Sequence, residues 1–183
     1  IGVIENQAPT KSLEFDLPVE EGNVQITEGV AYLSLVERHR GTGTVTNGFV
    51  SGFGYTGSMA IASSVAHDSH HMIVVGTDRK LMAAAANRLG EVGGGVTLWK
   101  DGAERALVEL PIAGLMSDSQ AAEVANKAQA IISAMIDCGC SLNNAYMQHT
   151  LLALVVIPEL RISDLGLVDV SRFELTEVIS PES

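Results

Sequence analysis

The sequence is poor in basic residues. It has 11 Lys and Arg against 22 Asp and Glu among 183 residues, which gives a formal net charge of -11. Binding to a nucleic-acid backbone depends on clustered Lys and Arg that neutralise phosphates, and anionic membranes attract the same side chains. The basic residues here are scattered along the chain, so we expect neither nucleic acid nor a membrane as a partner.

Long apolar runs and cysteines are scarce as well. The longest apolar run, Leu151–Ile157, has seven residues, far fewer than the roughly 20 that span a bilayer, and we interpret it as a buried strand. The two cysteines, Cys138 and Cys140, are separated by one glycine. That spacing would strain a disulfide, and no second pair completes a zinc site. Reduced thiols in a cytoplasmic protein are therefore expected, with a redox pair as the alternative.

The length and composition favour one globular domain. Hydrophobic residues make up 46% of the chain, which is ordinary for a protein with a buried core. No internal repeat or clear linker divides residues 1–183. The chain opens on Ile1 and carries no signal-peptide pattern. Because Ile1–Ile4 has the composition of the middle of a strand, we expect a piece of a longer polypeptide.

Two helices are predicted with some precision. The first covers Arg79–Glu91, with Thr77-Asp78 as the capping pair and the glycines at 93–95 as its end. The second begins at a capping box, in which Ser117 caps and Gln120 reaches back, and it continues to about Asp137.

Most of the remaining sequence has the composition of strands. Ser12–Leu17 alternates polar and apolar residues, as a half-buried strand does. Asp101-Gly102 predicts a tight turn between two strands, and residues 173–179 are a candidate last strand. These signals indicate an α/β (α+β layered) domain with a mixed, largely antiparallel sheet, two main helices and no TIM barrel.

A polar segment between two apolar strands is the first candidate for function. The predicted strands Ala60–Ala66 and Met72–Thr77 are joined by His67-Asp68-Ser69-His70-His71, which has the composition of a turn. A packed core gains nothing from so many polar residues together. His39, next to a glycine-rich loop, is a further candidate, whereas a lone histidine such as His149 is expected to be structural.

Three interpretations of the segment remain open. His67, Asp68 and His70 could converge on a metal ion as a small independent site. Alternatively, Asp68 and Ser69 satisfy turn amides, and the histidines lock the strand ends as a purely structural feature. In the third interpretation the segment faces a cavity and helps to hold a ligand bound mainly by another domain.

Other kinds of active site find little support. The glycines between Gly48 and Gly57 run into a strand, whereas a phosphate loop should open a helix. Ser63, Ser64 and Ser69 lie near histidines, but no Gly-x-Ser-x-Gly elbow is present. The acidic residues are spread along the chain, so paired catalytic carboxylates are not evident.

The sequence resembles the C-terminal domain of the adenine deaminase family. The matching segments follow one another along nearly the whole chain: Glu37-Arg38-His39, Gly41-Thr42-Gly43, Gly52-Phe53-Gly54, Ala62 to His70, Val74 to Thr77, Asn87-Arg88-Leu89, Gly93-Gly94-Gly95, Pro111 to Ser117, Pro158-Glu159-Leu160 and Gly166 to Val170. One departure is His71, which stands where the family usually has Asn.

The resemblance implies an amidohydrolase that converts adenine to hypoxanthine and ammonia in adenine catabolism and purine salvage. The family's metal, manganese or iron, is held by a barrel upstream of the matched region. We therefore expect no catalytic or metal-ligating residue, no cofactor in this chain, and an isolated chain that is inactive. The implied partners are the barrel, adenine as substrate, and further copies in a homo-oligomer.

Under this hypothesis His39, His67, Asp68, Ser69 and His70 order loops at the barrel mouth or contact the purine. The competing hypothesis is a non-catalytic assembly or packing module. Its contact surface would be formed by apolar residues around Phe49, Phe53, Ile112 and Leu115.

Overall fold

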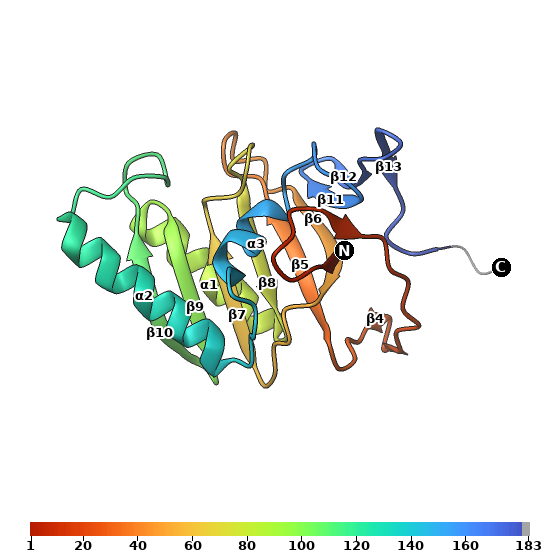
Figure 1. Cartoon of the computed structure of the whole chain (residues 1–183), viewed down its shortest axis with the longest axis horizontal. Helices are drawn as coiled ribbons and strands as arrows, with labels where there is room; N and C mark the ends of the chain where they lie inside the picture. The colour runs from red at the N-terminus through yellow and green to blue at the C-terminus, as the bar shows by residue number, and fades with distance from the viewer. Residues whose placement is uncertain (181–183) are drawn as a thin grey trace.

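The computed structural model describes residues 1–180, which form a layered α+β domain (Figure 1). Its centre is an eight-stranded sheet in which all neighbouring strands are antiparallel except the parallel pair β1–β6. In spatial order the strands are β10 (Ala103–Glu109), β9 (Gly95–Lys100), β7 (Met59–Ser63), β8 (Met72–Gly76), β5 (Val30–Val36), β6 (Val45–Ser51), β1 (Gly2–Val3) and β2 (Thr10–Lys11).

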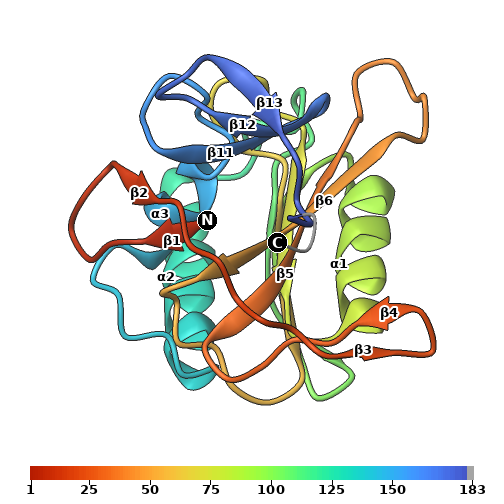
Figure 2. The ribbon, with the colours of Figure 1, turned by 90° about the vertical axis from the view of Figure 1, so that its right-hand side faces the viewer.

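Helices cover both faces of this sheet. Helix α1 (Arg79–Val92) lies on one face, and α2 (Ala121–Asp137) and α3 (Ala145–Leu151) lie on the other (Figure 2). A three-stranded sheet adjoins this body, and a short separate hairpin contacts it through Tyr32 and Arg79, which both donate to the Val24 carbonyl. Their strands are β11 (Leu160–Ser163), β12 (Gly166–Asp169), β13 (Glu174–Thr176), and β3 (Val19–Glu20) with β4 (Asn23–Val24). The predicted fold class is confirmed, with no closed barrel in residues 1–180.

Strands β7 and β8 are buried on both faces, which explains their almost wholly apolar sequences. Ala60 and Val74 face α1, whereas Ile61 and Ile73 belong to the larger core under α2 and α3. Because the side chains of a strand alternate between the two faces of a sheet and both faces are covered here, nearly every position of these strands carries an apolar side chain. Their connecting turn is thereby held on a rigid support.

The first predicted helix is confirmed closely. The Asp78 carboxylate accepts hydrogen bonds from the backbone amides of Lys80 (2.8 Å) and Leu81 (3.2 Å), and Gly93 ends the helix with a φ of 82°. The predicted turn at Asp101-Gly102 joins β9 to β10.

The prediction of a capping box at the start of α2 is wrong, although the helix itself is present and ends at Asp137 as expected. Gln120 occupies the N-cap position and makes no side-chain capping bond. The Ser117 hydroxyl accepts instead from the Ser119 amide at 3.2 Å. It therefore stabilises the preceding loop rather than the helix.

Two strand predictions are also wrong. Leu151–Ile157 is not a strand, because the end of α3 and a series of turns occupy it. Ser12–Leu17 is a largely exposed segment outside any sheet, and the Ser12 amide donates to the Glu159 carboxylate at 2.7 Å. The alternation of polar and apolar residues in Ser12–Leu17 could not show that this segment has no neighbouring strand to pair with. Of residues 173–179, only Glu174–Thr176 forms a strand.

The core also settles the environment of several residues discussed above. Cys138 and Cys140 are free and buried. Phe53 is only 2% exposed and stacks on Tyr55 with ring centroids 5.1 Å apart. The predicted apolar contact surface therefore cannot include Phe53.

None of the helices within residues 1–180 is long and apolar enough to cross a membrane.

Candidate functional site

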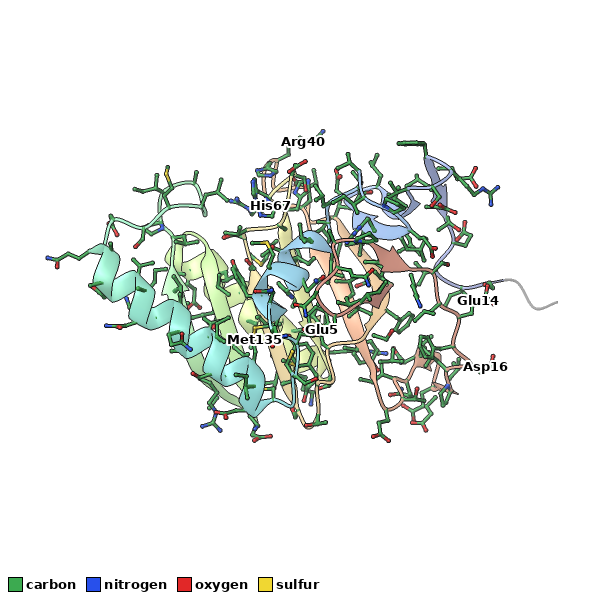
Figure 3. The ribbon with its side chains drawn as sticks, viewed as in Figure 1. Glu5, Glu14, Asp16, Arg40, His67 and Met135 are labelled. Atoms are coloured by element: carbon green, nitrogen blue, oxygen red, sulfur yellow. The ribbon has the colours of Figure 1, made fainter. Side chains whose placement is uncertain are left out.

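The turn between β7 and β8 lies at one end of the central sheet, beside the loop that follows β5. Figure 3 shows His67 and Arg40 at this end. Asp68 and Ser69 are exposed, and His67 and His70 are half-buried. The sequence prediction that these polar residues gather at one sheet end is confirmed.

His70 closes the turn on itself. Its backbone amide donates to the Ala66 carbonyl at 2.7 Å, and its ring Nδ1 accepts from the Ala66 amide at 3.3 Å. The pKa of His70 lies below its usual value because burial disfavours the imidazolium, and His67 and Arg38 add repulsion. At neutral pH its Nδ1 is thus an acceptor, and its Nε2 carries the proton. The His67 and His70 rings meet edge to face at 5.4 Å.

The loop after β5 fastens the turn from the side. The guanidinium of Arg38 donates from Nε to the His70 carbonyl (2.6 Å) and from a terminal nitrogen to the Ala113 carbonyl (3.0 Å). The Nε2 of His39 lies 2.6 Å from the Ser69 carbonyl oxygen. Since a carbonyl only accepts, that nitrogen carries a proton. Three segments distant in sequence are thus joined at the turn.

Glu37 organises this loop. Its buried carboxylate accepts from the backbone amides of His39 (2.6 Å), Arg40 (2.8 Å) and Thr42 (3.1 Å), and from the Thr42 hydroxyl (3.0 Å). These donors, the Thr42 amide foremost, lower the pKa of Glu37 to about 2. The carboxylate therefore stays ionised, and the loop that carries His39 is held in one conformation.

His71 is buried beneath the loop. Its ring lies 4.6 Å from that of His39. Its Nε2 is 3.7 Å from the Asp164 carboxylate and its Nδ1 is 4.0 Å from that of Glu37. Burial lowers the pKa of His71 more than these carboxylates raise it. The imidazole is therefore mainly neutral at pH 7, and the contacts become ion pairs only in acid.

Helix α3 supports the turn from the other side of the sheet. The His67 amide donates to the Thr150 carbonyl at 3.0 Å, and the Tyr146 hydroxyl lies 3.2 Å from the Ser63 hydroxyl. His149 is completely buried beside the Ile73 backbone, and burial lowers its pKa to about 4. The expectation that His149 is structural agrees with this position.

The described residues do not offer a metal centre. Within residues 1–180, no three His, Cys, Asp or Glu side chains are grouped so that they could hold a metal ion. The interpretation of His67, Asp68 and His70 as an independent metal site therefore finds no donor set. The bonds of His39, His70 and the turn backbone fit a structural role. The accessible parts of His67, Asp68 and His70 leave room for contact with a ligand.

In the structure His39 contacts Ser69, and the ring of His67 contacts that of His70. These four residues were all candidates from the sequence. The sequence analysis missed Arg38, Glu37 and Asp164 as members of the site. The charged triplet Glu37-Arg38-His39 before a glycine-rich loop was a usable signal for two of them. Asp164 had none, because only the tertiary fold places the β11–β12 turn beside His71.

The fold and the site define a layered α+β domain with an imidazole-rich turn, distinct from a barrel hydrolase. The family model described as the adenine deaminase C-terminal domain matches residues 7–174, and the chain belongs to this family.

Named relatives agree with this assignment. Adenine deaminase of Roseobacter denitrificans is 75% identical over 179 residues, that of Ruegeria pomeroyi 72% over 184, and that of Moorella thermoacetica 43% over 182. The matches cover 98%, 99% and 97% of this chain. The chain spans 30% of the length of each relative.

Proposed function

We propose that this chain is the C-terminal domain of an adenine deaminase that hydrolyses adenine to hypoxanthine and ammonia. Within that enzyme, the domain would support an active site carried by the rest of the polypeptide. The relatives named adenine deaminase support the reaction, and the 30% of their length that this chain spans supports a division of labour.

The manganese or iron of such an enzyme would belong to its barrel. Residues 1–180 do not fit a metal ion, because they lack a grouped set of three ligands. The proposal therefore assigns this domain no step of the hydrolysis. The roles that it assigns to the domain are to position loops and to exclude water at the active site of the full enzyme.

The observation that carries the proposal is the β7–β8 turn. Its backbone is held from two segments distant in sequence, by Arg38 and His39 of the loop after β5 and by Thr150 of α3. Fixed on this support, His67, His70 and Asp68 present an imidazole pair and a carboxylate at one end of the sheet. Such groups match the ring nitrogens and amino group of a purine, or the loops around it.

The test is adenine deamination by the full-length enzyme carrying His67→Ala, His70→Ala or Asp68→Ala. We expect kcat/KM to fall by about tenfold or more, the equivalent of one lost hydrogen bond, with little change in Tm for His67→Ala and Asp68→Ala. Asp118→Ala is the matched control, because Asp118 is exposed in a loop outside this turn. Wild-type turnover and stability in all three variants would contradict the proposal.

Two further properties belong to the proposal. We expect the full-length enzyme to be a cytoplasmic homo-oligomer. Light scattering of the purified enzyme gives its mass, and cell fractionation gives its location. The packing alternative retains Ile112 and Leu115 as exposed contacts (45% and 36%), without Phe53.

A further inference from the structure

A groove of about 870 Å³ lies at the end of the molecule away from helix α2. One wall is the irregular segment Ser12–Leu17, the floor includes Phe49 of β6, and the other wall is the segment Thr176–Ser180 after β13. Figure 3 shows Glu14 and Asp16 at this end, apart from His67. The groove is thus distinct from the β7–β8 turn.

Large apolar side chains are exposed along and beside the groove. Leu13 (43%), Phe15 (49%) and Ile179 (63%) line it, and Leu175 (56%) lies next to it on β13. Phe173 is 85% exposed. Single exposed apolar residues need no explanation, whereas a contiguous group of this kind marks an interaction surface.

The backbone around the groove is also unpartnered. Within residues 1–180, the amides of Leu13–Leu17 donate to no acceptor. Strand β13 pairs only with β12, so its outer edge is open over the described part of the chain. Open edges are normally covered or blunted in a finished protein.

The charge of the groove has one sign. Glu14, Asp16, Asp169 and Glu177 line it, and none of its lining residues among 1–180 is Lys or Arg. A complementary surface is therefore apolar with Lys and Arg at its margin. A second copy of this chain would bring carboxylates against carboxylates, which opposes self-association at this face.

We propose that this groove and the β13 edge are the docking surface for the larger part of the same enzyme, which would meet them with an apolar surface rimmed by basic residues. This inference rests on the proposed function. In the relatives most of the polypeptide lies outside the matched 30%, and the family description places that part before this domain.

Hydrogen–deuterium exchange of the full-length enzyme tests the inference. We expect the amides of Leu13–Leu17 and Glu177–Ser180, which lie outside the paired strands, to exchange at least about tenfold more slowly than the exposed loop Asp118–Gln120. Phe15→Asp with Leu175→Asp should abolish this protection. Ile136→Asp, at a residue 60% exposed on α2, is the matched control and should preserve it.

Two outcomes overturn the inference. One is exchange in both segments as fast as in Asp118–Gln120. The other is protection that disappears on dilution together with a fall in mass by light scattering, which would assign the groove to a second copy. If His67→Ala still lowers turnover while the groove amides exchange freely, the docking surface is refuted and the proposed function stands.

Discussion

The buried imidazole of His149 links the fold to pH. Its pKa falls from an ordinary 6.5 to about 4 because the protonated ring would be desolvated. Between these values the unfolded chain binds a proton that the folded chain does not. The associated stability is therefore complete above pH 6.5 and is lost as pH falls to about 4, by about 3 kcal/mol.

The test is urea unfolding at pH 7.5 and 4.5. His149→Leu should lower the pH-dependent loss of unfolding free energy by about 2 kcal/mol, because the titrating group is gone. Equal pH dependence in wild type and His149→Leu would show that the ring is accessible to protons in the folded state.

Single residues were the hardest feature to place from the sequence. The rings of His67 and His70 are in contact because a four-residue turn brings its first and last residues close together, which is a local effect. His149 and Asp164 reach the same region only through the path of α3 and the β11–β12 turn. No spacing in the sequence encodes that path.

Among the elements, the two long helices differ in how they begin. Asp78 caps α1 with two amide bonds and accepts a third hydrogen bond from the Ser58 hydroxyl at 2.8 Å. Gln120 at the start of α2 makes no such bond.

Asp78→Ala should therefore lower the unfolding free energy by about 1–2 kcal/mol, since amides of the first turn lose their acceptor. Gln120→Ala should change it by less than about 0.5 kcal/mol. Chemical denaturation with tryptophan fluorescence measures both, because Trp99 packs against the α1 core. Similar losses in the two variants would contradict the assignment of the cap.

The elements that could be predicted have local signals. A cap residue and a closing glycine delimit α1, and an Asp-Gly turn delimits the β9–β10 hairpin. Helix α3 was missed because its seven residues, Ala145–Leu151, include polar and β-branched members and no cap bond. Its position is imposed by packing on β8, a tertiary effect that overrides propensity.

At the scale of the whole molecule, Arg161 joins distant parts of the chain. Its guanidinium, only 1% exposed, donates to the carbonyls of Ala8 (2.5 Å), Leu151 (2.9 Å) and Ile157 (2.8 Å). Burial lowers its pKa to about 10, so the charge is retained at neutral pH.

Replacing this side chain leaves three carbonyls without their donors. Arg161→Leu should therefore cost about 3 kcal/mol or more of unfolding free energy. Arg172→Leu, at an exposed residue with one surface ion pair to Glu174, should cost less than about 1 kcal/mol. Thermal and urea unfolding of the two variants give the comparison. A loss below about 1 kcal/mol in Arg161→Leu would contradict its role.

The layered, mainly antiparallel architecture could be predicted from apolar runs and turns. The order of the strands could not, because β5 pairs with β8 although β6 and β7 lie between them in the sequence. The same limit applied to the site. Its central turn was evident, whereas Arg38 and Thr150, which hold it, come from segments that only folding brings near.

Residues near the start of the chain are hydrogen-bonded to residues near its end. The Thr10 amide donates to the Pro158 carbonyl (2.9 Å), the Glu159 amide donates to the Thr10 carbonyl (3.2 Å), and Arg161 reaches Ala8. On the ribosome, Thr10 can therefore make these two bonds only after nearly the whole domain has been translated. A polypeptide that stops before β11 lacks these bonds to Ala8 and Thr10. Its first residues are then a natural target for quality-control proteases.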